Sequence, residues 1–389
     1  MTEHQTQLGK TILILSVSAG AGHARAAEAI RAYAQSAKPD CRVIHLDVMD
    51  FVTLGFRKIY TDFYVRLVNR APTLWGYLYN FTNDARADSS MEKLRRSLER
   101  WNAKALLREI ANLNPDAIIC THFLPAEMLA RLIARHELDC PVWVQVTDFD
   151  LHRMWVHKGM AGYFAANQEV AFRMREHGIA ADTIHVTGIP IMPAFAKTLS
   201  REKCAPAFGL APSRFTMILM GGGAGLGNLD EVAARLLGLQ LPAENPSSQF
   251  QLIVLAGKNH RALQALQTLA LSYPQRLFPI GFTSQVERLM VCADVVITKP
   301  GGLTTSECLA MGLPMIVNAP IPGQEERNAD YVLEQGVALK AVDSLALIYR
   351  IQELIAQPDR LSTMTQRAKL LGKPNAAQAV FERVFASLC

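Results

Sequence analysis

A glycine turn at residues 300–302 has the residue types that a nucleotide site needs. It follows an apolar run that ends at Ile297, and a helical pattern begins shortly after it. Glycines at the start of a helix leave the backbone N–H groups accessible. These groups can bind a phosphate, because that end of a helix carries partial positive charge. One turn into the helical pattern, Glu307 offers a carboxylate that can accept hydrogen bonds from both hydroxyls of a ribose. The turn is therefore a candidate nucleotide site.

The same side chains also have purely structural interpretations. Thr304 and Glu307 have the spacing of a capping box, in which the glutamate reaches back to the first N–H of its own helix. Gln324 and Glu325 follow a turn at Pro322-Gly323 and offer donors and acceptors that suit sugar hydroxyls. They are also ordinary polar residues for the first turn of a helix.

A second glycine turn, earlier in the chain, carries a histidine that we expect to act as a base. Gly20-Ala-Gly22-His23 follows an apolar run and leads into an alanine-rich helical pattern at 24–37. An imidazole with a pKa near neutrality can take a proton from an alcohol while that oxygen attacks. The alternative is that His23 caps the helix or binds a backbone carbonyl. The spacing is a weak match to a dinucleotide fingerprint, because Arg25 stands where the third glycine would be.

Apolar runs that alternate with helical patterns predict a doubly wound α/β fold. Polar residues follow two of these runs, as Thr121-His122 and Thr147-Asp148, at strand ends where open α/β sheets place ligand groups. The runs that we expect to form strands are 11–17, 42–48, 117–120, 142–146, 163–166, 185–187, 215–220, 252–256, 295–297 and 315–318.

The order and spacing of these motifs resemble the GT-B glycosyltransferases, in particular the family of monogalactosyldiacylglycerol synthases and processive diacylglycerol glucosyltransferases. The resemblance covers nearly the whole chain. It implies two Rossmann-like doubly wound domains that face a cleft, and transfer of a hexose from a UDP-sugar to diacylglycerol to make a glycoglycerolipid. His23 would be the catalytic base, Asp148 would orient it or the acceptor, and Gly20 and Gly22 would lie at the acceptor. An aspartate that caps the next turn is the alternative for Asp148.

By the same resemblance, the second half of the chain binds the donor. Phe282 would hold the uracil, Glu307 the ribose, and the glycine turns the diphosphate. Backbone N–H groups and helix N-termini can stabilise a diphosphate as a metal does elsewhere, and we expect no Asp-x-Asp pair that holds a divalent cation. We therefore expect no metal and no other cofactor. The expected donor-binding residues are Gly222, Gly223, Gly257, Lys258, Asn259, Gly281, Phe282, Thr283, Gly301, Gly302, Thr304, Thr305, Glu307, Gln324, Glu325 and Asn328.

Length and composition fit two globular domains, because the 389 residues are 50% hydrophobic and only 19% charged. We expect an acceptor domain at 1–195, a donor domain at 196–365, and a C-terminal helix at 366–389 that packs back on the first domain. The seven cysteines include no C-x-x-C pair, and their scattered distribution fits reduced thiols in a cytoplasm. The apolar run near the N-terminus is too short for a secretory signal and is followed by His23 and Arg25.

Residues 51–110 are expected to meet the anionic inner face of the cell membrane peripherally. They hold eleven Lys and Arg against six Asp and Glu, together with an aromatic stripe. The alternative is that the aromatic residues belong to the core. No apolar run approaches the roughly 18 residues that span a bilayer. The residues assigned to the acceptor or membrane here are Phe56, Arg57, Lys58, Tyr60, Phe63, Arg66, Arg70 and Trp75.

The expected partners are therefore a UDP-hexose, diacylglycerol and an anionic membrane surface, with no nucleic acid. Three other functions remain open from the sequence. The protein could transfer the sugar to another lipid or a soluble acceptor, it could epimerise a UDP-sugar, or it could be a non-catalytic UDP-sugar sensor at the membrane.

Overall fold

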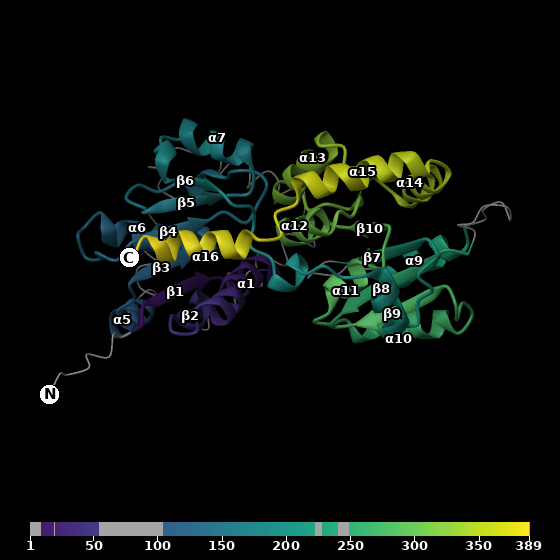
Figure 1. Ribbon diagram of the computed structural model, residues 1–389, viewed down its shortest axis with the longest axis horizontal. Coiled ribbons are helices and arrows are strands. Elements are labelled where there is room, and N and C mark those ends of the chain that lie inside the picture. Colours follow the sequence, from purple (N-terminus) through teal and green to yellow (C-terminus); the bar gives the residue numbers. More distant parts are fainter. Residues whose placement is uncertain (1–8, 19, 54–103, 222–227, 240–248, 389) are drawn as a thin grey trace. The chain divides into compact units, whose positions relative to one another are not determined.

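The computed structural model describes residues 9–18, 20–53, 104–221, 228–239 and 249–388. The chain divides into two compact units, of which one contains Met1–Pro193 and Asn375–Cys389 and the other contains Ala194–Pro374. Each unit has a six-stranded sheet with helices packed on it (Figure 1). All of the described strand pairs are parallel. The two-domain α/β architecture that the sequence predicts is confirmed.

The sheet of the first unit has the strand order β2-β1-β3-β4-β5-β6. Its strand β1 is buried on both faces, because Leu13 and Leu15 pack into one hydrophobic cluster while Ile12 and Ile14 pack into another. Complete burial of one such side chain stabilises a fold by about 1.5–3 kcal/mol. The elements are β1 (Thr11–Ser16), α1 (Ala21–Ala37), β2 (Arg42–Asp47), α5 (Lys104–Leu113), β3 (Ala117–Cys120), α6 (Phe123–Ile133), β4 (Val142–Gln145), β5 (Gly162–Ala165), α7 (Gln168–Glu176), β6 (Ile184–Val186) and α16 (Ala376–Ala386).

The sheet of the second unit has the strand order β12-β11-β10-β7-β8-β9. Its central strands are continuous apolar runs that are buried on both faces, as is typical of parallel sheets. The elements are α8 (Arg201–Cys204), β7 (Thr216–Met220), α9 (Leu229–Leu237), β8 (Gln251–Gly257), α10 (His260–Ala270), β9 (Leu277–Gly281), α11 (Val286–Met290), β10 (Val295–Thr298), α12 (Gly302–Met311), β11 (Met315–Asn318), α13 (Gln324–Glu334), β12 (Ala338–Ala341), α14 (Ser344–Ala356) and α15 (Pro358–Leu371).

The last helix of the chain belongs to the first unit, where α16 packs against α1 (Figure 1). Phe381 is buried in the cluster that contains β1 residues, and the hydroxyl of Tyr33 donates to Glu382 Oε1 at 2.7 Å. The expected C-terminal segment 366–389 thus divides between the units. Its first part lies in α15, which packs on α12 and α14 of the second unit, so the chain crosses at Pro374 rather than at 365. Among the described helices, none is both long and apolar enough to cross a bilayer.

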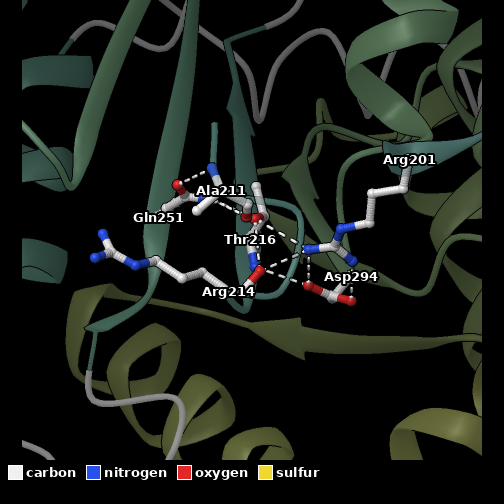
Figure 2. A network of polar contacts seen from close by, with 6 residues as sticks. All are labelled: Arg201, Ala211, Arg214, Thr216, Gln251 and Asp294. Carbon is white, nitrogen blue, oxygen red and sulfur yellow. Dashed lines mark hydrogen bonds and ion pairs between the residues drawn. The ribbon is translucent and has the colours of Figure 1, made fainter. Parts of the chain in front are cut away.

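A polar network joins the amino-terminal ends of three neighbouring strands in the second unit (Figure 2). Asp294, which precedes β10, accepts from Arg201 Nη1 at 2.8 Å and from the Thr216 backbone N–H at 2.7 Å. Gln251, at the start of β8, donates to Thr216 Oγ1 at 3.1 Å and accepts from the Ala211 N–H at 2.8 Å. The network therefore ties the amino-terminal ends of these three strands together.

Replacing Asp294 by Asn should lower the free energy of unfolding by about 2 kcal/mol, because Arg201 then loses a largely buried charge-assisted partner. The matched control is Glu169→Gln, which removes one partner of an exposed ion pair with Arg173 and should change stability by less than about 1 kcal/mol. Chemical denaturation measures both variants. If both variants lose the same free energy of unfolding, the network does not stabilise the sheet more than an exposed ion pair does.

Candidate functional site

His23 lies at the third residue of α1, and strand ends of the same sheet hold its ring. The imidazole Nδ1 is 3.0 Å from the carbonyl oxygen of Thr121 and 2.8 Å from the Thr147 hydroxyl. Thr121 follows β3 and Thr147 follows shortly after β4, and β1, β3 and β4 are neighbours. The Thr121 hydroxyl also donates to the His23 carbonyl at 3.0 Å. The ring and the backbone of His23 are therefore both hydrogen-bonded to residues at the carboxyl ends of β3 and β4.

These contacts determine which ring nitrogen of His23 is basic. A carbonyl oxygen can only accept, so Nδ1 carries the proton and Nε2 keeps its lone pair. The residue is half-buried, and burial lowers the pKa of the imidazole from 6.5 to about 4, although the hydrogen bond to Thr121 opposes this effect. His23 is therefore neutral near pH 7 and can accept a proton at Nε2.

The structure bears out part of the structural alternative for His23. The ring binds a backbone carbonyl through Nδ1, which leaves Nε2 for a proton, and the role of His23 as a base stays a prediction. His23 does not cap the helix, because the N-cap of α1 is Gly20, with φ +105°, and no side chain caps it. Gly22 is the second residue of the helix.

Two aromatic rings lie beside the His23 imidazole, and a third ring packs against those two. The ring of His122 meets it edge to face, with centroids 4.4 Å apart, and Trp155 lies at 6.2 Å. Phe123 packs against both His122 and Trp155, at 4.1 and 5.9 Å. Burial, together with the nearby His23, holds the pKa of His122 well below its usual range. The candidate base thus has aromatic rings beside it in addition to the oxygens of Thr121 and Thr147.

Asp148 comes directly after Thr147 and is buried, with 6% of its surface exposed. Asp150 is similarly buried, and Arg173 Nε lies 3.4 Å from its Oδ1. These two aspartates have the Asp-x-Asp spacing, so the expectation that the chain contains no such pair is wrong. The described residues contain no group of three or more His, Cys, Asp or Glu side chains that could hold a metal ion.

In the second unit, the glycine turn after β10 begins a helix as the sequence predicts. Gly301 is the N-cap of α12, and no side chain caps this helix. Thr304 is therefore the third helical residue rather than the N-cap, and Glu307 lies in the second turn. The capping-box interpretation of these two residues is wrong, because the helix starts too early for it. The side chain of Thr305 is completely buried, and its hydroxyl has no hydrogen-bond partner among the described residues.

The first turn of α13 lies against this glycine turn. A Cβ added to Gly301 would be 3.9 Å from Glu325 Oε1, while Glu325 Oε2 accepts from the Ile321 N–H at 2.7 Å. Burial raises the pKa of Glu325, and that hydrogen bond and Lys299 oppose the rise. Glu325 thus has one oxygen on the backbone, and Glu326 caps the helix through Gly323. Among the expected sugar-binding residues, Gln324 and Glu325 are half-buried, whereas Asn328 is completely buried.

An exposed aromatic ring lies at the carboxyl end of β9, the edge strand on the far side of β7 and β8 from β10. Phe282 follows β9 and is 71% exposed, and Lys258 Nζ, from the end of β8, lies 5.4 Å from the ring centroid. The β8 strand ends at Gly257 with φ +56°, which favours glycine. The other side chains have local roles, since Asn259 caps α10 and the Thr283 hydroxyl accepts from the Gln285 N–H.

Along this edge, the expected contacts follow the order of the strands. The Phe282 ring and Lys258 lie at β9 and β8, the Gly301-Gly302 turn at β10, and Glu325 after β11. Along this edge, an aromatic ring is therefore followed by N–H groups at a helix start and then by a carboxylate. A nucleotide sugar has a base, a diphosphate and a sugar in the same order. The expected residues outside the described parts of the chain are Gly222, Gly223, Phe56, Arg57, Lys58, Tyr60, Phe63, Arg66, Arg70 and Trp75.

Sequence relatives match both halves of the chain. Residues 23–191 match the monogalactosyldiacylglycerol (MGDG) synthase family, and residues 216–380 match the glycosyltransferase family 28 C-terminal domain. A processive diacylglycerol beta-glucosyltransferase of Bacillus pumilus is 31% identical over 272 residues, which are 70% of this chain and 68% of the relative. The protein of the same name from Bacillus subtilis is 29% identical over 271 residues, which are 69% and 68% of the two chains.

Solved structures share the fold at low sequence identity. MurG of Acinetobacter baumannii has a TM-score of 0.62 at 17% identity, over 97% of this chain and 99% of MurG. The complex of S. aureus MnaA with UDP has a TM-score of 0.60 at 13% identity, over 98% of each chain. These likenesses concern the fold alone. Together with the sequence relatives, they show that the chain has the GT-B fold and belongs to the family of monogalactosyldiacylglycerol synthases and processive diacylglycerol glucosyltransferases.

Proposed function

We propose that the protein transfers a hexose from a UDP-hexose to the free hydroxyl of diacylglycerol. The observation that carries the proposal is the environment of His23, whose Nδ1 is bound by Thr121 and Thr147 so that Nε2 is the basic nitrogen. Family membership supports both the sugar donor and the lipid acceptor, because the relatives are named as diacylglycerol glucosyltransferases.

In the proposed reaction, Nε2 of His23 takes the proton of the acceptor hydroxyl while that oxygen bonds to the anomeric carbon of the sugar. The bond between the anomeric carbon and the phosphate oxygen breaks, and UDP leaves with the electron pair. The N–H groups at the start of α12, next to Gly301 and Gly302, stabilise the negative charge on the diphosphate. We expect that this stabilisation needs no metal ion, so turnover should persist in a chelator.

We also propose that residues 51–110 bring the protein to the anionic inner face of the cell membrane. The support comes from composition, since this segment has eleven Lys and Arg against six Asp and Glu. A lipid acceptor does not diffuse freely through water, so its enzyme needs a surface that binds the bilayer. Basic residues near an anionic surface contribute about 1 kcal/mol each, and salt screens them.

The first test incubates the protein with UDP-hexoses and diacylglycerol and identifies the glycolipid by mass spectrometry. His23→Ala should reduce kcat by about 10²-fold or more with donor affinity unchanged, because it removes the base and no donor contact. The control is His177→Ala, at an exposed helix end, which should keep full turnover. A donor consumed without acceptor would indicate an epimerase, and an unchanged kcat in His23→Ala would remove this residue from the mechanism.

The pH dependence gives an independent check on His23. The neutral imidazole is the reactive form, and its pKa lies near 4 rather than 6.5. The rate kcat/KM should therefore not fall as the pH drops through 6.5, but only nearer 4, in a pH profile of the free enzyme. If kcat/KM instead falls around pH 6.5, and His23→Ala abolishes that fall, the ring is exposed to water and the expectation is wrong.

Replacing Glu307 by Gln should weaken UDP-hexose binding by more than about tenfold, because a charged acceptor of two hydroxyl hydrogen bonds becomes neutral. The melting temperature should hardly change, since Glu307 does not cap α12. Calorimetric titration with UDP-hexose measures the affinity. Glu326→Ala, which removes a true capping side chain, is the control and should lower stability but not affinity. If Glu307→Gln instead lowers the melting temperature and leaves the affinity for UDP-hexose unchanged, Glu307 does not contact the ribose.

Charge reversal at four basic residues of the membrane segment should greatly reduce sedimentation with anionic liposomes. Parent protein should bind at low salt and be released at high salt. The matched control reverses four exposed charges in the second unit and should leave binding intact. The test residues are Arg57, Lys58, Arg66 and Arg70, and the control residues are Lys203, Arg235, Arg261 and Lys340. Full binding by a folded test variant would refute the docking proposal.

A further inference from the structure

His122, at the end of β3, is held in one neutral tautomer. It is the N-cap of α6, and its Nδ1 accepts a hydrogen bond from the Leu124 backbone N–H at 3.0 Å. A backbone N–H can only donate, so Nδ1 keeps its lone pair and the ring proton lies on Nε2. Protonation at Nδ1 would break the cap, and the positive end of the helix also opposes a charge there. His122 is therefore a fixed N–H donor that stays uncharged.

This donor lies beside the candidate base. His122 directly follows Thr121, whose carbonyl binds His23, and the two imidazole rings are in edge-to-face contact at 4.4 Å. His122 is only 2% exposed, and the hydrogen bond of its ring to the described residues is made at Nδ1. Its Nε2 is not among the buried side-chain atoms that lack a partner, so this N–H group keeps some access to the surroundings and can donate to an oxygen from outside the protein.

The two histidines thus offer one acceptor, at Nε2 of His23, and one donor, at Nε2 of His122. Diacylglycerol has the complementary pair, a free hydroxyl that can donate and a neighbouring ester carbonyl that can only accept. A donor aimed at the hydroxyl oxygen itself would reduce its nucleophilicity, whereas a donor to the ester carbonyl leaves the attacking oxygen free. A neutral donor also avoids placing a second positive charge next to His23 when it takes the proton.

We propose that His122 donates its Nε2–H to the ester carbonyl next to the reacting hydroxyl, and so selects acyl-linked over ether-linked glycerol. This inference rests on the proposed transfer to diacylglycerol and adds a specificity residue to it. A site built to hydrogen-bond a polar group discriminates strongly against an analogue that lacks it, because its own buried donor is then left unpaired. The parent enzyme should therefore prefer 1,2-diacylglycerol to 1,2-dialkylglycerol of equal chain length.

The test measures kcat/KM for both acceptors, presented in the same mixed micelles, with two variants that separate the roles of His122. In His122→Asn, the side-chain oxygen can still cap α6 but the Nε2–H donor is lost. We expect kcat/KM for diacylglycerol to fall at least about tenfold, with little change for the dialkyl acceptor or in melting temperature. In His122→Gln, the amide nitrogen reaches the position of Nε2 but the cap is lost. This variant should melt earlier and regain part of the acyl preference.

Loss of a helix cap elsewhere provides the control. Asp343→Ala removes the side chain that accepts from the Ala346 N–H at 2.7 Å in the second unit, and should lower stability while keeping the acyl preference. The inference fails if His122→Asn keeps the parent ratio of the two acceptors, or if it slows both equally. If the parent makes no glycolipid from either acceptor, the proposed function fails instead.

Discussion

The hydrogen bond between His23 Nδ1 and the Thr121 carbonyl is the interaction on which the proposed chemistry of the first unit depends. It assigns the proton to Nδ1, and therefore the lone pair to Nε2, without using a charged partner. The bond exists only because β1 and β3 are parallel neighbours, with Leu15 in register with Cys120. The helix that follows β1 and the residue that follows β3 then meet at one edge. The apolar pattern of the strands thus decides the tautomer of a histidine far away in sequence.

In the second unit, the network of Arg201, Asp294 and Gln251 anchors the strands at their amino-terminal ends (Figure 2). At the opposite ends of the strands, α12 begins on glycine, and no side chain caps it. Uncapped N–H groups retain the partial positive charge that a side chain would otherwise neutralise. In the proposed function, these uncapped N–H groups are the ones that bind the diphosphate.

The sequence predicts the buried strands well, because a strand covered on both faces is a continuous apolar run. It does not predict β9 and β12, and both are edge strands that are less buried. β9 contains Pro279 and β12 contains the exposed Lys340, which edge strands tolerate and central strands do not. The sequence also singles out Thr147-Asp148, but spacing alone cannot show which side chain turns toward His23. Similarly, the capping box at Thr304 fails because the helix start depends on the backbone of the glycine turn.

Burial of His23 lowers the pKa of its imidazole, and this affects both the stability of the fold at low pH and the protonation state of the ring. Its folded-state pKa is about 4, against 6.5 for the free group, so between these values an unfolded chain binds a proton that the folded chain does not. Folding is therefore increasingly disfavoured as the pH falls below 6.5. In return, the imidazole is neutral at pH values well above 4, although a base with so low a pKa is weak. In the proposed reaction the Nδ1–H becomes a stronger donor when Nε2 gains a proton, so the oxygens of Thr121 and Thr147 bind the imidazolium more strongly than the neutral ring.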